Sequence, residues 1–349
     1  MAPRLTRRPA GGLITVLAVF LLLASAGCSA ASEERVVEVG FYAFFDPVSS
    51  SADADPTSPE FNVHVGYEAD LLTAIEAMEG YGLRFNRTAV PQWTDIWLRP
   101  AGDEFDLAGG GITILESRTR DDAGEAVVAF TDGHIDFTQS LLVRAGDAPR
   151  LPDHEALLPA DVVGVLPNTT GEARLLQILG VADEDGGLAA GTRIETPSGW
   201  VTVETDGSLA ISAARASPEL AARTRLMAAD PDRPEILYLG EEPDAEVGEQ
   251  ELLAALADGT IDAIARGTAG NTLAAASSDD AFVVTALDSR PERGGFVVDI
   301  DDTGLLKKMN VAIAWLTDGG RIGLAEWLAD PRVFLDRAAL WDDRSRDRS

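Results

Sequence analysis

The amino-acid sequence predicts an α/β protein built from two lobes. From residue 36 onward, short apolar runs alternate with segments of helical periodicity, which is the pattern of βα units on a largely parallel sheet. The same alternation starts again at Asp161. With 349 residues, of which 46% are hydrophobic, the chain is long enough for two domains that each bury a core.

The first run opens with an apolar segment at residues 36–42 that predicts a strand. A polar loop follows, and apolar residues between 71 and 78 then share one face of a predicted helix that ends at Gly80. The next expected elements are a strand from residue 83, a short helix at 93–98, a strand and loop at 105–114, and a short strand at 127–130.

The second run opens with a predicted strand at 162–166 and a helix that ends at Gly180. Its later elements are expected to be strands at 236–239 and 261–265 and helices at 250–257 and 268–276. The C-terminal part predicts a strand at 296–298, a strongly periodic helix at 305–316 and a final helix that carries Trp327.

Residues 183–234 interrupt this pattern with loops rich in glycine and aspartate. Alternation on both sides of Asp206-Gly207 predicts a β-hairpin within residues 200–211. Residues 217–229 are predicted to be helical. This stretch is therefore expected to be an insertion in the second lobe.

The charge of the chain limits its partners. It has 28 Lys+Arg and 58 Asp+Glu, a formal net charge of −30, and so acidic a surface repels phosphate backbones and excludes nucleic acid as a partner. Arg4, Arg7 and Arg8 precede an apolar run at 13–24 that is short for a membrane span, which predicts a signal peptide at residues 1–27. Its removal leaves a formal charge of about −33 on the exported part.

Cys28 is the only cysteine, so the chain has no intrachain disulfide and its stability depends on the core. The segment Leu23-Ala24-Ser25-Ala26-Gly27-Cys28 resembles the lipobox of bacterial lipoproteins, in which the cysteine is lipidated. Ser25 departs from the usual leucine, and Ala24-Ser25-Ala26 also suits ordinary signal cleavage. We expect lipidation of Cys28, a tether at 28–35 and anchoring to the outer face of the cell membrane, with a soluble secreted or periplasmic form as the alternative.

Several short motifs occur in a recognisable order. They are Gly66-Tyr67-Glu68-Ala69-Asp70-Leu71-Leu72, Phe105-Asp106-Leu107, Gly111-Ile112-Thr113-Ile114, Asn168-Thr169-Thr170-Gly171-Glu172 and Gly259-Thr260-Ile261-Asp262-Ala263. In this order and spacing, the chain resembles the extracytoplasmic solute-binding proteins, family 3, that serve amino-acid-type ABC importers. The resemblance covers residues 36–345 apart from 183–234.

That resemblance implies the two-lobe, periplasmic-binding-protein-like fold of type II, in which largely parallel sheets flanked by helices are joined by two hinge crossings. The crossings are expected near residues 137–140 and 287–293. Lobe 1 would then comprise residues 36–138 and 293–349, and lobe 2 residues 139–292.

The resemblance also implies a clamp for a ligand carboxylate. By motif position, Arg118 would be the bidentate guanidinium, with Thr113 and the Gly111 backbone beside it. The alternative for Arg118 is a solvated surface charge. On the second lobe, Thr169 and Thr170 lie between a strand and a helix, where the helix N-terminus favours an anion, and either threonine alternatively caps that helix.

The walls and the charge selectivity of the site follow from further motif positions. Phe45 and Trp93 correspond to ligand-stacking aromatic residues, although either also suits an ordinary core. The two acids that usually bind a ligand ammonium are replaced by Tyr42 and Gly267, and Arg266 precedes the second position. Both amino acids and organic acids without an amine therefore remain open as ligands, with Asp46 as a substitute acid in the first case.

The implied function is a solute-binding receptor of an ABC importer that captures a small carboxylate and delivers it to the permease and its ATPase. The receptor is expected to be a monomer without a metal, a cofactor or enzymatic activity. One alternative is a periplasmic dehydratase of the cyclohexadienyl or arogenate type on the same scaffold, which needs a general acid that no motif places in the cleft. The other is a binding protein that reports its ligand to a signalling partner.

Overall fold

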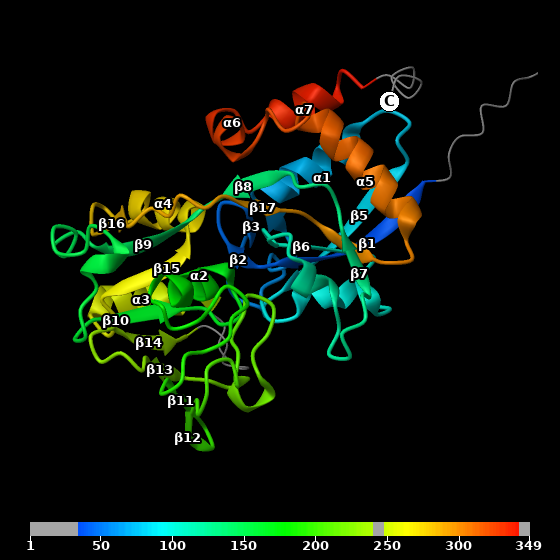
Figure 1. Ribbon diagram of the computed structural model, residues 1–349. Helices are drawn as coiled ribbons and strands as arrows, with labels where there is room; N and C mark the ends of the chain where they lie inside the picture. The colour runs from blue at the N-terminus through cyan, green and yellow to red at the C-terminus, as the bar shows by residue number, and fades with distance from the viewer. Residues whose placement is uncertain (1–33, 240–247, 342–349) are drawn as a thin grey trace, which may run out of the picture.

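The computed structural model describes residues 34–239 and 248–341. The predicted signal peptide, Cys28 and most of the predicted tether therefore lie outside the described residues. Two sheets dominate the fold, and we call the parts of the chain built on them the first and the second lobe (Figure 1). Across the described ranges, no helix has the length and apolar character needed to cross a membrane.

The first lobe contains a five-stranded sheet in the order β5-β1-β6-β18-β7. Its strands are β1 (Arg35–Tyr42), β5 (Leu83–Val90), β6 (Leu107–Gly109), β7 (Val128–Phe130) and β18 (Val297–Asp299). β1 pairs in parallel with β5 and β6, whereas β18 pairs antiparallel with β6 and β7. The chain thus returns to the first sheet after passing through the second.

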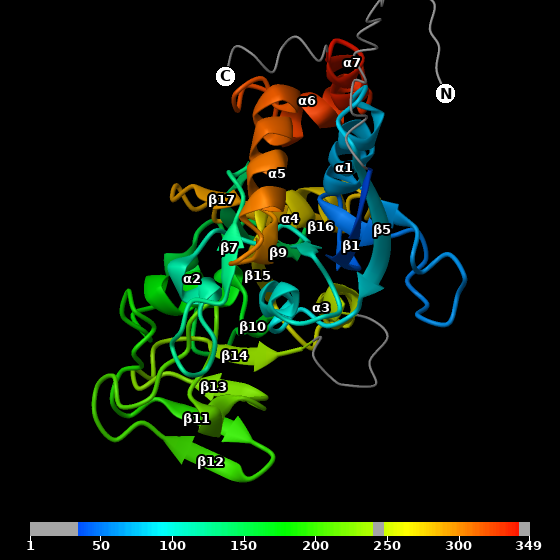
Figure 2. The ribbon, with the colours of Figure 1, turned by 90° about the vertical axis from the view of Figure 1, so that its right-hand side faces the viewer.

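Helices gather at one end of the first lobe (Figure 2). They are α1 (Tyr67–Ala77), α5 (Thr303–Leu316), α6 (Leu324–Ala329) and α7 (Val333–Ala338), and the short 3-10 helices η1 (Ile96–Ala101) and η2 (Glu116–Thr119) belong to the same lobe. The expected final helix is α6, which carries Trp327. The further helix α7 follows it, and Pro331 lies between the two, outside both helices, since proline cannot donate the backbone hydrogen bond of a helix interior.

The second lobe contains an eight-stranded sheet in the order β12-β11-β13-β14-β10-β15-β9-β16. Its strands are β9 (Gln139–Arg144), β10 (Val162–Val165), β11 (Arg193–Thr196), β12 (Gly199–Thr202), β13 (Arg225–Met227), β14 (Glu235–Tyr238), β15 (Ala263–Gly267) and β16 (Phe282–Thr285). Its helices are η3 (His154–Ala156), α2 (Thr170–Ile178), η4 (Pro218–Leu220), α3 (Gly248–Asp258) and α4 (Thr268–Ala276). Only β14, β10 and β15 are parallel, and antiparallel strands extend the sheet on both sides.

Two adjacent strands connect the lobes. β8 (Ile135–Phe137) pairs antiparallel with β17 (Glu292–Gly294), and β9 of the second sheet starts only two residues after β8 ends. A separate three-stranded sheet of β2 (Phe44–Phe45), β3 (Ser49–Ser51) and β4 (His64–Val65) follows β1. β8 and β17 therefore bring residues from both chain crossings to the junction of the lobes.

Two hydrophobic clusters hold the fold together. The larger one surrounds β1 and includes Phe41 and Phe296, and it continues into the second lobe through residues such as Leu252. The other fills the second lobe and includes Ile194 and Leu220 of the 183–234 stretch, which are fully buried. The insertion is thus packed into the core of the second lobe, so it is an integral part of that lobe.

The local structure of the insertion differs from the prediction. Residues 217–229, predicted to be helical, contain only the short η4, followed by the strand β13. The hairpin is formed by β11 and β12, upstream of the expected Asp206-Gly207 turn. The difference arises from non-local pairing. β13 forms hydrogen bonds with β14 and β11, and this pairing stabilises the segment more than its local helix propensity would.

Candidate functional site

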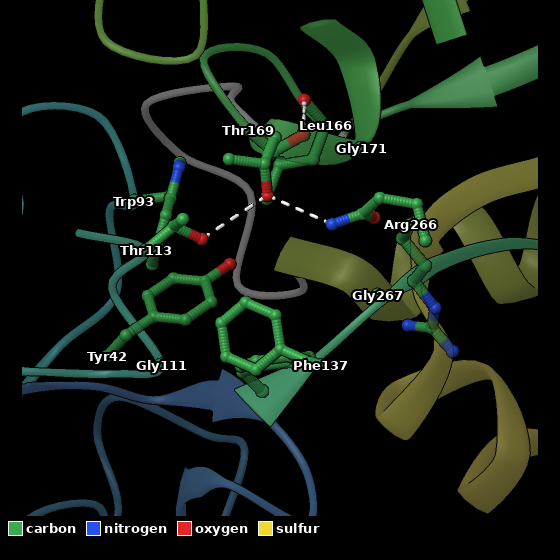
Figure 3. Close-up of a pocket in the computed structure, with 13 residues that line it drawn as sticks. Tyr42, Trp93, Gly111, Thr113, Phe137, Leu166, Thr169, Gly171, Arg266 and Gly267 are labelled. Carbon is green, nitrogen blue, oxygen red and sulfur yellow. Dashed lines mark hydrogen bonds between the residues drawn. The ribbon is translucent and has the colours of Figure 1, made fainter. Parts of the chain in front are cut away.

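A small cavity of about 40 Å³ lies between the two lobes, with room for roughly three water molecules (Figure 3). Its lining residues are Tyr42, Phe45, Trp93, Gly111, Thr113, Phe137, Gln139, Leu166, Thr169, Thr170, Gly171, Arg266 and Gly267. They come from both lobes and from the connecting strand β8. A carboxylate metabolite is larger than this space, so its access requires the lobes to separate or the lining side chains to move.

The N-terminus of helix α2 faces this cavity. After β10, Asn168 takes up a left-handed conformation with φ of 59°, and the chain turns into the helix. Thr169 is the N-cap, since its Oγ1 accepts a hydrogen bond from the Glu172 N–H at 3.1 Å. The N–H groups of the first turn, from Thr170 and Gly171, have no partner within the helix, and together with the helix dipole they favour an anion at this position.

Thr170 links the helix to the other side of the cavity. Its Oγ1 accepts a hydrogen bond from Gln139 Nε2 at 3.0 Å and lies 3.5 Å from Thr113 Oγ1 of the first lobe (Figure 3). Thr113 and Thr170 are almost fully and partly buried, respectively. Hydroxyl groups from the two lobes therefore meet across the cavity, which makes them suited to holding one polar group of a ligand jointly.

Four aromatic rings enclose the cavity. Tyr42 and Trp93 meet edge to face with ring centroids 5.2 Å apart, and Phe45 and Phe137 do so at 6.5 Å. Trp93 also joins the lobes, because its Nε1 donates to the Asn168 carbonyl at 2.9 Å. Gly111, with φ of 68°, leaves the room that Phe45 needs, since a Cβ there would lie 2.6 Å from the Phe45 ring.

Arg118 lies beside the cavity but is not among the residues that line it. It is fully buried, and its guanidinium stacks over Trp93 and Trp97, with Cζ 5.2 and 4.5 Å from the ring centroids. Burial lowers the pKa of this guanidinium to about 9, against the charge of Glu292, so Arg118 remains protonated at neutral pH.

The hydrogen bonds of Arg118 are directed at main-chain carbonyls. Nε and Nη2 donate to the Ala213 oxygen at 3.2 and 2.8 Å, Nη2 also donates to the Asn168 oxygen at 3.1 Å, and Nη1 donates to the Thr113 oxygen at 3.4 Å. Ala213 and Asn168 belong to the second lobe, whereas Arg118 belongs to the first. In this arrangement Arg118 joins the two lobes, and its role as the clamp of a ligand carboxylate stays a prediction.

The geometry agrees with a sequence comparison. The profile of the bacterial extracellular solute-binding proteins, family 3, matches residues 39–327. The chain belongs to this family. No sequence among the curated proteins matches the chain.

Solved structures of amino-acid-binding proteins share the fold at low sequence identity. A substrate-binding protein of an ABC uptake transporter from Streptococcus pneumoniae, with bound histidine, has a TM-score of 0.53 and 16% identity, and the match covers 88% of this chain and 92% of that one. An arginine-binding protein from T. maritima has a TM-score of 0.52 and 20% identity, and the match covers 82% of this chain and 91% of that one. AncCDT-1, an ancestral amino-acid-binding protein and precursor of cyclohexadienyl dehydratase, has a TM-score of 0.51 and 18% identity, and the match covers 88% of this chain and 95% of that one.

In this family 3 protein, most of the residues singled out from the sequence meet at the cavity: Phe45, Trp93, Gly111, Thr113, Thr169, Thr170, Arg266 and Gly267. The backbone N–H of Gly111, however, donates to Glu68 Oε1 at 3.0 Å, so the buried Glu68 already satisfies it. The Arg266 guanidinium turns toward α4, where Nε donates to Asn271 Oδ1 at 2.7 Å and Nη2 to the Gly270 oxygen at 3.1 Å (Figure 3).

Sequence reasoning missed Phe137, Gln139 and Glu292 as site residues. Phe137 and Gln139 line the cavity, and the Glu292 carboxylate contacts two lining residues, Thr113 at 3.2 Å and Gln139 at 3.0 Å. All three lie at the crossings that the sequence placed near 137–140 and 287–293. The usable signal was their position, because a segment that passes between two lobes lies next to the space between them.

The insertion supports both sides of the site. Arg223, which is 4% exposed, donates from Nε and Nη2 to the Glu172 carboxylate at 2.9 and 2.8 Å and from Nη2 to Asn168 Oδ1 at 3.1 Å. Burial acts to lower the pKa of Arg223, but the neighbouring Glu172 carboxylate raises it overall. This ion pair fixes the turn that precedes α2.

A second part of the insertion reaches the first lobe. Arg215 Nη1 donates to the Asp121 oxygen at 3.0 Å and Nη2 to the Arg120 oxygen at 2.6 Å. Together with the Ala213 carbonyl on Arg118, these bonds connect the turn at 212–215 to the segment that follows η2. The insertion therefore carries contacts that exist only while the lobes are close together.

Proposed function

We propose that this family 3 protein is the receptor of an ABC importer and that its two lobes close on a small carboxylate-bearing solute, an amino acid or a related organic acid. The observation that supports this most is the meeting of the α2 N-terminus and the Thr170 hydroxyl with Thr113 of the other lobe across one cavity. The ligand carboxylate would bind the Thr170 hydroxyl and the N–H groups of Thr170 and Gly171, which have no partner within the helix.

Closure is the step that such a receptor contributes to transport. Donors from opposite lobes hold the same ligand group, so the ligand binds the closed form more tightly and raises its population. The interlobe bonds of Arg118 and Arg215 add to the closed form. A permease would then distinguish the loaded receptor by its shape.

The predicted boundaries at 138/139 and 292/293, the lipid anchor on Cys28 and delivery to a permease with its ATPase are part of this proposal. Pairing of β8 with β17 at the junction of the lobes supports the boundaries. Lipidation is tested in cells by detergent phase partition. The wild-type protein should enter the detergent phase, and a Cys28→Ala variant should remain in the aqueous phase, whereas equal partition of both would exclude the anchor.

Ligand binding is tested with the exported chain and a panel of amino acids and organic acids. We expect at least one carboxylate to raise the melting temperature and to be recovered chemically unchanged. Thr170→Val, which removes one hydroxyl but keeps the shape, should weaken binding by roughly tenfold. Thr224→Val, which alters an exposed threonine of the same lobe, should have no effect.

Two results would contradict the proposal. If no carboxylate at millimolar concentration stabilises the chain, the receptor function is wrong. If prephenate or arogenate is converted to a decarboxylated, dehydrated product, the protein is the dehydratase that the similarity to AncCDT-1 keeps as the second candidate.

A further inference from the structure

A carboxylate reaches the cavity from a direction that the sequence motifs do not indicate. Glu292 begins β17, where it pairs with Phe137 of β8 at the junction of the lobes. Its Oε2 accepts hydrogen bonds from Thr113 Oγ1 at 3.2 Å and from Gln139 Nε2 at 3.0 Å. Both donors line the cavity, so the negative charge of Glu292 lies at its edge.

Gln139 contributes a second acceptor at the same place. Its side chain is 4% exposed, and its Nε2 is engaged by Thr170 Oγ1 and Glu292 Oε2. Within the described residues, nothing donates a hydrogen bond to its Oε1, although this atom is buried. A buried carbonyl oxygen without a donor is costly, so this atom is a ready acceptor for a ligand N–H group.

The two acceptors lie next to the donors of the α2 N-terminus, because Gln139 bonds both to Thr170 and to Glu292. The α2 N-terminus favours an anionic ligand group, and Arg118 provides a buried positive charge beside the same space. A ligand that carried only a carboxylate would bring its charge close to that of Glu292, and the two charges would repel each other at short range. A ligand with a carboxylate and a positive nitrogen would satisfy both sides.

We infer that Glu292 and Gln139 bind a positively charged nitrogen of the ligand and make the site selective for zwitterions over organic acids without an amine. The inference rests on the proposed receptor function and narrows its ligand class. It assigns the acidic role to a residue of the connecting strand, in a chain where Tyr42 and Gly267 occupy the positions at which an acid was expected.

The experiment compares matched ligand pairs that differ in one group. Each α-amino acid of the panel is titrated by calorimetry beside the 2-hydroxy acid of the same carbon skeleton, for example leucine and 2-hydroxyisocaproate. The proteins are wild type, Glu292→Gln, Glu292→Asp and Asp136→Asn. Asp136 is the control because it is an exposed acid of the paired strand β8, and its Oδ1 lies 3.7 Å from Arg293 Nε.

Wild type should prefer the amino member of a pair. Glu292→Gln should weaken binding of that member by roughly 30-fold or more and leave the hydroxy member unchanged or tighter, because only the amine needs the charge. Glu292→Asp should keep the preference for the amine, and Asp136→Asn should behave as wild type.

The contrary outcomes distinguish a failure of this inference from a failure of the proposed receptor function. If Glu292→Gln binds the amino member as tightly as wild type, or more tightly, Glu292 does not hold the nitrogen and the inference is wrong while the receptor function stands. A wild type that prefers the hydroxy member overturns the inference in the same way. If no carboxylate of either kind binds to wild type, the proposed function itself fails.

Discussion

Replacement of Arg118 by methionine should shift the protein away from its closed form. Methionine preserves a flexible apolar side chain between Trp93 and Trp97 but removes the charge and all donors. In the closed form the Ala213 carbonyl then loses both of its bonds from Arg118, and the Asn168 carbonyl loses its Arg118 bond but keeps the one from Trp93 Nε1. In an open form, water satisfies both carbonyls.

The expected magnitude follows from those two acceptors. At about 1–1.5 kcal/mol for each acceptor that loses Arg118, the closed form loses about 2–3 kcal/mol relative to the open form. That is roughly a 30- to 150-fold change in the ratio of closed to open molecules, and ligand affinity falls by up to the same factor if only the closed form binds. Arg215→Met, which removes the bonds to Arg120 and Asp121, should act in the same direction with a smaller effect because Arg215 is only partly buried.

The assay combines calorimetric titration with small-angle X-ray scattering of the free and ligand-saturated protein. Arg118→Met should show a larger radius of gyration at equal ligand concentration and a weaker affinity, with little change for Arg99→Met, whose side chain lies over Phe105 within the first lobe. Burial of the Arg118 guanidinium acts in the opposite direction, because it costs free energy in the closed form; the same burial lowers the pKa of this group to about 9. If Arg118→Met closes more readily or binds more tightly than wild type, burial outweighs the hydrogen bonds and the reasoning is refuted.

Three further predictions concern the scaffold of the site. Arg223→Met should lower the free energy of unfolding by about 3–5 kcal/mol in urea, because it leaves the fully buried Glu172 carboxylate without its partner, and a loss below about 1 kcal/mol would contradict this. Gly171→Ala should weaken ligand binding and cost about 1–3 kcal/mol of stability, since its Cβ would lie 2.9 Å from the Ala265 oxygen, and an unchanged affinity would show that α2 can shift freely. Burial holds the pKa of His64 well below 6.5, so the unfolded chain takes up a proton at higher pH than the folded protein does. The free energy of unfolding therefore falls as the pH drops below 6.5, by at most about 1.4 kcal/mol per pH unit. His64→Gln should reduce this dependence of stability on pH, and the same dependence in both proteins would exclude the effect.

Matched controls isolate these effects. Arg321→Met removes an exposed arginine paired with Asp318 and should change stability by less than about 1 kcal/mol. Gly304→Ala adds a Cβ that would meet its nearest neighbour at 3.7 Å, an ordinary contact, and should leave ligand binding unchanged. The pH series for His64→Gln is compared with wild type, because His154, whose pKa is also lowered by burial, contributes equally to both proteins.

The elements that could be predicted are those whose signal is local. The apolar segment at 36–42 is strand β1, and the periodic segment at 305–316 lies within helix α5. The turn into α2 was also predictable, because a strand, a capping threonine and a helix follow one another within a few residues. The 183–234 stretch was predicted poorly because its strands depend on partners elsewhere in the chain, such as β14 for β13.

Sequence patterns and motifs predicted two α/β lobes, a helix N-terminus carrying Thr170 that faces the space between them, and aromatic residues such as Trp93 at the border of that space. The contacts of the charged groups became evident only from the three-dimensional arrangement. Arg118 is enclosed by two indoles and bonded to carbonyls of the other lobe, and Glu292 meets Gln139, 153 positions away in the chain, at the edge of the cavity. The physical reason is that periodicity reports which face of an element is buried, whereas the partner of a long polar side chain depends on which distant segments the fold brings within hydrogen-bond distance.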